Sequence, residues 1–275
     1  MPGRSRRRSL GPADAPEKEV TAQAMTRLTY ARAGIDHTKG VLPHGAGNQL
    51  EALRDTNFNS YFRMAAMRDM ECWELDSSVA DLADKNPEAL TAAMAELAQG
   101  GNCGEHATIA YDFLRMQMGE DTVNMCDKSG LDHAFLILGN VSSDSDSDLA
   151  VCDPWPTSPT SCLWEDHFAY DEDRTKLNVR SSVTGNTEDV KSAISSGLRL
   201  SAKGEQMIQQ AFDDKRTEEE IKSGTEGDKP WIWEHGNAAS ETFQYVQEDE
   251  EAKAEQTATD PEYAAYQSWL ERFGA

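Results

Sequence analysis

The segment that follows Cys103 repeats apolar residues at intervals of three and four positions, which is the spacing of one face of an α-helix. These residues are Ala107, Ala110, Tyr111, Leu114 and Met118. The pattern predicts a helix from Cys103 to about Gly119, with a glycine-rich turn directly before it. Cys103 is therefore expected at the amino-terminal end of a helix, where the dipole and the free backbone N–H groups favour a thiolate.

Two apolar runs further along the chain predict a pair of strands. Residues 131–139 are apolar on both alternating faces, which is typical of a strand covered on both sides. Residues 149–153 form a second short run, and the residues between the two runs are polar and rich in Ser and Asp. A hairpin is the simplest connection. Side chains on one face of paired strands lie close together, so His133 and Asp153 can meet if the register permits.

Helical patterns flank this core on both sides. They cover residues 21–73 and 87–97 before it, and residues 187–200, 205–212 and 261–273 after it. Beyond Tyr170 the helical segments alternate with polar, acidic stretches, and the scattered aromatic residues favour a segment that packs back onto the core.

We therefore predict an α+β fold in which a central helix that carries Cys103 packs on an antiparallel sheet, with flanking helices. Three parts of the chain are expected. Residues 1–20 are rich in Arg, Gly and Pro and predict a disordered leader, residues 21–170 predict a catalytic domain with N-terminal helices, and residues 171–275 predict an acidic, mainly helical C-terminal extension.

The residue types at these positions point to covalent catalysis by a thiol. Cys103 is the candidate nucleophile, His133 the base that takes its proton, and Asp153 the carboxylate that fixes the orientation and tautomer of the imidazole. Attack on an amide carbonyl creates an oxyanion, for which the backbone N–H of Cys103 is a candidate donor together with a side-chain amide from Gln99 or Asn102. Gln99 is favoured, because Asn102 can instead cap the helix.

Three motifs carry a family resemblance. Gly-Asn-Cys-Gly-Glu-His-Ala at 101–107, Asp-His-Ala-Phe at 132–135 and Cys-Asp-Pro-Trp at 152–155 resemble the Cys, His and Asp motifs of papain-like and transglutaminase-like cysteine enzymes. The closest likeness is to bacterial effector and toxin domains, some of which are proteases and others glutamine deamidases. The resemblance covers about residues 85 to 170 and implies a hydrolase acting on a protein substrate, without a cofactor. It also implies a protein made in the bacterial cytoplasm and secreted into a host or target cell, although a solvated tail explains residues 1–20 equally well.

Other interpretations of the same residues stay open. Cys103 and His106, with His133, Cys126 and Cys152, are residue types that zinc accepts, but no paired Cys-x-x-Cys supports a zinc site. A non-catalytic interaction module with the same fold is the second alternative. Each motif also has a structural explanation, since buried Cys and His often serve only packing.

Composition narrows the classes of partner. The net charge of -23 argues against nucleic acid and anionic membranes, because their phosphates would be repelled. No run approaches the length of a membrane span. Five cysteines without the spacing of a disulfide scaffold suit a reducing compartment. The oligomeric state is left open.

Overall fold

A five-stranded antiparallel sheet forms the centre of the structure, a computed structural model that describes residues 7–185, 187–223 and 232–248. The strand order is β7-β6-β5-β4-β8. The strands are β4 (Thr122–Lys128), β5 (Leu131–Leu138), β6 (Ala150–Cys152), β7 (Cys162–Leu163) and β8 (Leu177–Thr184). The predicted hairpin is confirmed, because β5 and β6 pair antiparallel with Leu136 opposite Cys152.

Helices α1 (Ala22–Val41) and α6 (Cys103–Leu114) pack against each other and onto this sheet. Their apolar side chains and those of β4 to β7 form the largest hydrophobic core of the described residues. The helix predicted to start at Cys103 is confirmed, but it ends at Leu114 and not near Gly119. Residues 115–117 continue as a turn, in which the N–H of Gln117 bonds the carbonyl of Leu114.

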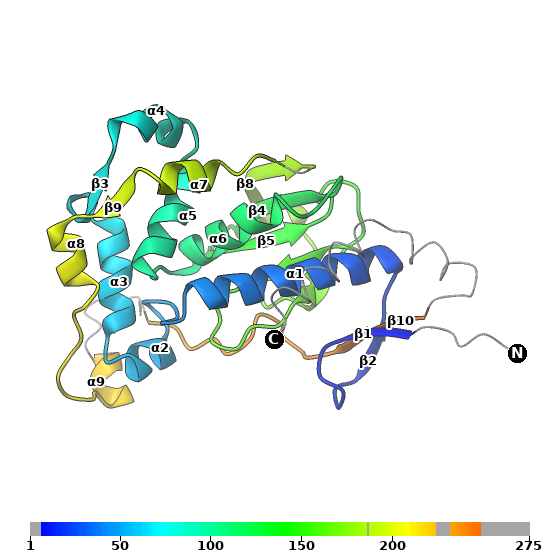
Figure 1. Cartoon of the computed structure of the whole chain (residues 1–275). Helices are drawn as coiled ribbons and strands as arrows, with labels where there is room; N and C mark the ends of the chain where they lie inside the picture. Colours follow the sequence, from blue (N-terminus) through cyan, green and yellow to red (C-terminus); the bar gives the residue numbers. More distant parts are fainter. Residues whose placement is uncertain (1–6, 186, 224–231, 249–275) are drawn as a thin grey trace, which may run out of the picture.

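The remaining helices lie mainly around α5 and the C-terminal end of α1 (Figure 1). They are α2 (Leu50–Asp55), α3 (Asn59–Arg68), α4 (Ser77–Lys85), α5 (Pro87–Ala98), α7 (Val190–Ser195), α8 (Ala202–Met207) and α9 (Glu218–Ser223), with short 3-10 turns η1 (Met70–Cys72), η2 (Trp164–Asp166) and η3 (Arg174–Lys176). The helical pattern at 87–97 is confirmed by α5. None of the helices in the described ranges is long and apolar enough to cross a membrane.

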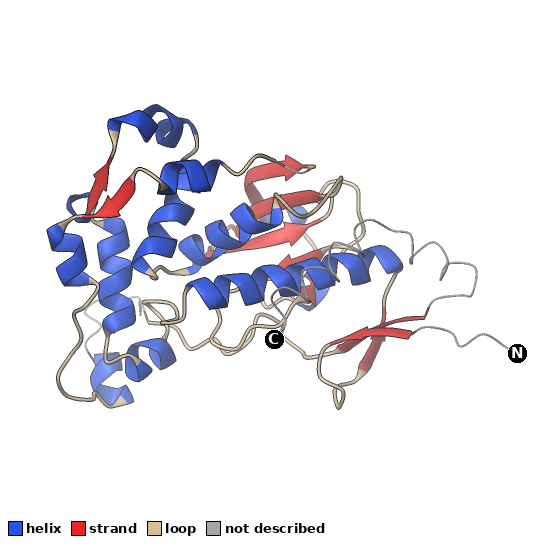
Figure 2. Cartoon of the chain, in the orientation of Figure 1, coloured by secondary structure: helices blue, strands red, loops and turns tan. Residues whose placement is uncertain are grey.

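Two small sheets join segments that are distant in sequence (Figure 2). In one, β10 (Gln244–Glu248) lies between β1 (Arg7–Leu10), to which it is antiparallel, and β2 (Glu17–Glu19), to which it is parallel. In the other, β3 (Trp73–Leu75) pairs with β9 (Leu198–Leu200).

Several expectations for the outer parts of the chain differ from the structure. Residues 7–10 and 17–19, expected to be disordered, are strands held by β10. The helix expected over residues 187–200 is only α7, because residues 198–200 pair with β3. β8, from the segment expected as a C-terminal extension, is an edge strand of the central sheet, and the expected folding back onto the core is therefore confirmed. The helix expected at 261–273 lies outside the described residues.

The turn between α5 and α6 fixes where α6 begins. Gln99 ends α5 in the left-handed conformation, and its N–H bonds the carbonyls of Ala95 and Glu96. A Cβ atom on Gly100 would stand 2.6 Å from the backbone carbon of Arg63 in α3, and one on Gly101 would stand 2.3 Å from Cβ of Glu105. Only glycine therefore lets the turn pass between α3 and the first turn of α6.

We expect Gly100→Ala to destabilise the protein by about 1–3 kcal/mol, because its new methyl group meets backbone atoms that cannot move aside. Thermal unfolding measures this as a fall of several degrees in the melting temperature. Gly104→Ala is the matched control, because a Cβ there would have no heavy atom within 4 Å and alanine favours the helix. Equal melting temperatures for the two variants would contradict this account of the turn.

Candidate active site

Cys103 is the first residue of α6 and its side chain is half-buried. The first backbone N–H groups of an α-helix have no partner among the carbonyls of the helix itself, which makes them candidate donors beside the thiol. Glu105 supports the turn, since its Oε2 accepts the backbone N–H of Asn102 at 2.6 Å. Arg68 holds the same carboxylate with two hydrogen bonds of 2.9 and 3.1 Å. Burial alone would raise the pKa of Glu105, but Arg68 outweighs it and keeps the pKa below its usual value.

A bulge in β5 positions His133. The ladder between β4 and β5 is regular down to the pair Asp127–Ala134, after which Lys128 pairs with Leu131. Asp132 and His133 therefore have no partners on β4. Bulges of this kind redirect side chains and occur often beside active sites. Asp132 is exposed, whereas His133 is buried.

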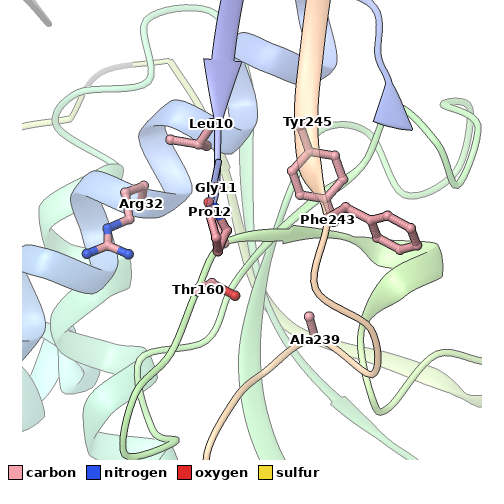
Figure 3. A pocket seen from close by; sticks show the side chains of 9 residues that line it. Leu10, Gly11, Pro12, Arg32, Thr160, Ala239, Phe243 and Tyr245 are labelled. Atoms are coloured by element: carbon pink, nitrogen blue, oxygen red, sulfur yellow. The ribbon is translucent and has the colours of Figure 1, made fainter. Parts of the chain in front are cut away.

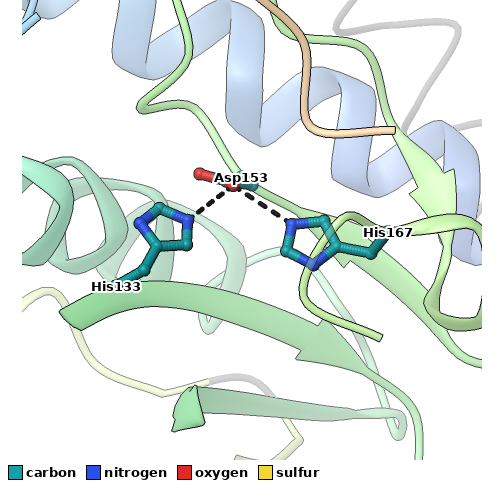
Figure 4. A group of neighbouring side chains, drawn as sticks. All are labelled: His133, Asp153 and His167. Atoms are coloured by element: carbon teal, nitrogen blue, oxygen red, sulfur yellow. Dashed lines mark hydrogen bonds and ion pairs between the residues drawn. The ribbon is translucent and has the colours of Figure 1, made fainter. Parts of the chain in front are cut away.

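His133 and Asp153 form a buried pair, as the hairpin predicted. Nε2 of His133 lies 2.7 Å from Oδ2 of Asp153, which has no exposed surface (Figure 4). The other carboxylate oxygen, Oδ1, accepts the backbone N–H of Trp155 at 3.2 Å. Asp153 is the residue directly after β6, so its backbone is fixed by the sheet and its side chain by these bonds.

The two pKa values move in opposite directions because each group stabilises the charge of the other. Burial alone would lower the pKa of His133, but the Asp153 carboxylate and, to a smaller extent, Cys103 raise it to about 10. Burial alone would raise the pKa of Asp153, but His133 and then His167 hold it far below its usual value. The pair is therefore an imidazolium and a carboxylate at neutral pH.

The remaining ring nitrogen of His133, Nδ1, is buried and has no hydrogen-bond partner among the described residues. Because Nε2 bonds Asp153, Nδ1 is the nitrogen available to exchange a proton with another group. Cys103 lies near enough to help raise the pKa of His133, but Nδ1 of the ring has no partner of normal hydrogen-bond geometry among the described residues.

The predicted oxyanion donors flank the thiol in sequence and have different surroundings. The side-chain oxygen of Gln99 lies 3.5 Å from Nη1 of Arg63. Asn102 is the N-cap residue of α6 and forms a capping box with Glu105, yet its Oδ1 makes no bond of strict geometry and is buried without a partner in the described part of the chain. Their role as donors stays a prediction.

Gln49 is a third amide near this turn, which the motifs did not indicate. Its loop contacts the turn directly, because the N–H of Gly47 bonds the carbonyl of Gly101 at 3.0 Å. Oε1 of Gln49 accepts the backbone N–H of His235 at 3.2 Å. Nε2 of Gln49 is buried and lacks a partner within the described ranges. A buried amide donor without a partner is rare, so this group is a candidate for binding an oxyanion.

His167 is a second histidine on Asp153, and sequence reasoning missed it. Its Nε2 lies 3.2 Å from Oδ2 of Asp153, the same oxygen that His133 contacts (Figure 4). The side chain has no exposed surface. The only sequence signal is a lone histidine after the short strand β7, which by itself indicates nothing more than packing.

Aromatic rings surround His133. Its ring centroid lies 4.7 Å from that of Trp155 and 5.1 Å from that of Phe168. Phe168 stacks on His235 at 4.6 Å. Residues 232–239, which include His235, cross this region: the N–H of Trp233 bonds the carbonyl of Asn48 at 2.8 Å, and the carbonyl of His235 accepts from Thr157 at 3.0 Å. The second half of the chain therefore supplies one wall around the candidate base.

The described residues contain one group of three side chains whose ligand atoms could converge on a metal ion, and it consists of His133, Asp153 and His167. The hydrogen bonds do not fit a metal. Nδ1 of His167 accepts the N–H of Ala169 at 3.2 Å, so the ring proton is on Nε2, the atom that a metal would need unprotonated.

The zinc alternative gains no support from the cysteines. None of them belongs to the converging group among the described residues, and none forms a disulfide. Burial raises the pKa of Cys126 to about 12 and that of Cys152 well above its usual value, which opposes the thiolate that zinc requires. His106 lies one turn from Cys103, and burial lowers its pKa to about 3, while its Nδ1 contacts the carbonyl of Asn102 at 2.8 Å.

A cavity of about 240 Å³ lies beside the small sheet of β1, β10 and β2 (Figure 3). Apolar side chains, among them Leu10, Phe243 and Tyr245, form most of its wall, with Arg32 at one side. None of the four residues Cys103, His133, Asp153 and His167 lines it. It is therefore separate from the candidate active site.

The His133–Asp153 pair gives a pH-dependent contribution to stability. From pH 6.5, the ordinary value for histidine, to about 10 the folded protein holds a proton on His133 that the unfolded chain releases, so stability falls as the pH rises. We expect Asp153→Asn to cost about 3–5 kcal/mol at pH 6, and this gap to shrink towards pH 10. Urea unfolding of both proteins at several pH values measures it.

Asp132→Asn, an exposed change in the same strand, is the control and should leave a small gap of about 0.5 kcal/mol or less at every pH. A gap for Asp153→Asn that does not change with pH would show that His133 is not held in its charged form.

Comparison with models of protein families, with curated proteins and with solved structures found no match to this chain.

Proposed function

We propose that this protein is a cysteine-dependent hydrolase that acts on amide bonds of a protein substrate, as a glutamine deamidase or a protease. The observation that carries the proposal is the buried His133–Asp153 pair. The second imidazole nitrogen of His133 has no partner among the described residues, and the pKa of His133 responds to the thiol of Cys103. A thiol at a helix amino terminus near an imidazolium is the environment in which cysteines become reactive. The same features support the resemblance to papain-like and transglutaminase-like enzymes, in which the helix with the cysteine packs on an antiparallel sheet.

The reaction follows from these roles. The Cys103 thiolate attacks the carbonyl carbon of the amide, and the carbonyl oxygen becomes an oxyanion bound by backbone N–H groups of α6 and a side-chain amide. The C–N bond then breaks, the imidazolium of His133 gives its proton to the departing nitrogen, and a thioester remains. Water attacks the thioester, gives a proton to His133, and releases a carboxylic acid. Asp153 keeps the ring oriented throughout.

The leaving group decides between the two activities. Ammonia leaves from a glutamine side chain in deamidation, and an amine leaves from the main chain in proteolysis, while the steps at Cys103 are the same. We favour both over crosslinking. The resemblance to effector and toxin domains further suggests a substrate in a host or target cell, and an inactive module of the same fold is the rival proposal.

Alkylation tests whether Cys103 is activated. The four other cysteines are fully buried and will react slowly whatever their role, so a small free thiol at the same pH is the proper reference. We expect iodoacetamide to label Cys103 at least about tenfold faster than that reference at pH 6, where an unassisted thiol is mostly protonated. His133→Gln should remove the advantage, and His37→Gln, on α1, should keep it. A rate no higher than the reference would favour the inactive module.

A comparison of wild type with a variant that lacks the thiol identifies the reaction. Candidate proteins are incubated with wild type and with Cys103→Ala, and mass spectrometry then searches for deamidated glutamines or new chain termini. Products that appear only with wild type support the proposal. Deamidated glutamines identify ammonia as the leaving group, and new chain termini identify a main-chain amine.

Oxyanion binding can be separated from thiol activation. Because alkylation by iodoacetamide forms no oxyanion, we expect Gln49→Met to leave the alkylation rate of Cys103 unchanged and to reduce turnover of an amide substrate about a hundred- to a thousandfold. Gln99→Met is the matched variant, and the larger loss of turnover identifies the donor. Equal, small losses in both would leave the oxyanion to the backbone N–H groups and Asn102.

A further inference from the structure

His167 is held rigidly by its own backbone. Its N–H bonds the carbonyl of Trp164 in η2 at 3.1 Å, and its carbonyl accepts from Tyr170 at 2.9 Å. A β-bridge pairs it with Ala239 of the 232–239 segment. The ring lies against Phe135 and Phe168, at centroid distances of 4.7 and 4.5 Å. The imidazole therefore has little freedom to turn or to meet water.

The hydrogen bonds determine the tautomer of this ring. The backbone N–H of Ala169 donates to Nδ1 at 3.2 Å, so Nδ1 carries a lone pair. The neutral ring then has its proton on Nε2, which donates to Oδ2 of Asp153 at 3.2 Å. Burial lowers the pKa of His167, which agrees with a neutral ring.

Asp153 consequently accepts three hydrogen bonds from three segments. His133 and His167 donate to Oδ2 at 2.7 and 3.2 Å, and the N–H of Trp155 donates to Oδ1 at 3.2 Å. Two donors on one oxygen and one on the other leave the carboxylate a single orientation. The orientation of the carboxylate in turn sets the plane of the His133 ring.

We propose that His167 is a positioning residue for the proposed hydrolase: as a neutral donor to Oδ2 of Asp153, it fixes the carboxylate so that His133 presents Nδ1 to the thiol of Cys103. This inference rests on the proposed function. It assigns the third member of the buried group a role that needs no metal and that His133 and Asp153 alone do not fill.

Two variants test the role through alkylation of Cys103. His167→Gln keeps an amide N–H close to the position of Nε2, whereas His167→Leu removes the donor at similar size. We expect His167→Leu to label with iodoacetamide about tenfold or more slowly than wild type, because a displacement of about 1 Å in a reacting group can cost a hundredfold. His167→Gln should recover most of the rate. Equal rates for both variants, whether fast or slow, would overturn the proposal.

Nitrogen-15 NMR of the imidazole rings gives a second measurement, on the wild type and on His167→Leu. We expect His167 to show a proton on Nε2 and none on Nδ1 at neutral pH, and His133 to lose its fixed ring signals in His167→Leu. A proton on Nδ1 of His167 in the wild type would overturn the proposal even if the variants do not fold.

The two proposals fail in different ways. If Cys103 of the wild type reacts no faster than a small free thiol, the hydrolase proposal fails. If it reacts fast and His167→Leu reacts equally fast, only the role of His167 fails.

Discussion

The carboxylate of Asp153 is a charge without any exposure to water, and the surrounding structure is arranged to stabilise it. An isolated buried carboxylate costs several kcal/mol, so it persists only where donors and an opposite charge surround it. The donors come from β5, from the residues directly after β6 and from the segment after η2. The Asp153 side chain thus joins three segments of the chain. Its hydrogen bond to His133 also helps to position that candidate base.

The Cys103 side of the site depends on a different constraint, which is space. Gly100 and Gly101 let the turn before α6 pass close to α3, and the carbonyl of Gly101 also receives the loop that carries Gln49. Cys103 is therefore positioned by steric fit and by the Glu105–Arg68 bonds, whereas His133 is positioned by the bulge in β5 and by its ion pair with Asp153. The two constraints meet at one site, because Cys103 lies near enough to His133 to help raise its pKa.

Local patterns in the sequence predicted the centre of this fold. The helix at Cys103, the hairpin of β5 and β6 and the contact of His133 with Asp153 follow from periodicity and from the polar connection between two apolar runs. Their partners lie nearby in sequence, so short-range rules are sufficient. The end of α6 was misplaced because apolar spacing continues into a turn that keeps single helical bonds, such as that from the N–H of Met118 to the carbonyl of Leu114, without continuing the helix.

Long-range pairing could not be predicted in this way. β1, β9 and β10 are too short for their own sequence to predict a strand, and distant segments complete their hydrogen bonds. His167 is recognised by its hydrogen bond to Asp153, and Gln49 by a buried amide nitrogen that has no partner among the described residues. No sequence motif indicates either feature. The bulge at His133 is of the same kind, since a register shift depends on both strands.

The sheet of β1, β10 and β2 has a consequence for synthesis of the chain. Residues 7–19 are translated before the other described elements, yet their strand partner, β10, is translated after all of them. The residues that wall the base, 232–239, also come late. A growing chain can therefore build the central sheet and α6 while β1 and β2 are still unpaired, and the candidate site gains the wall formed by residues 232–239 only after the central sheet has been made.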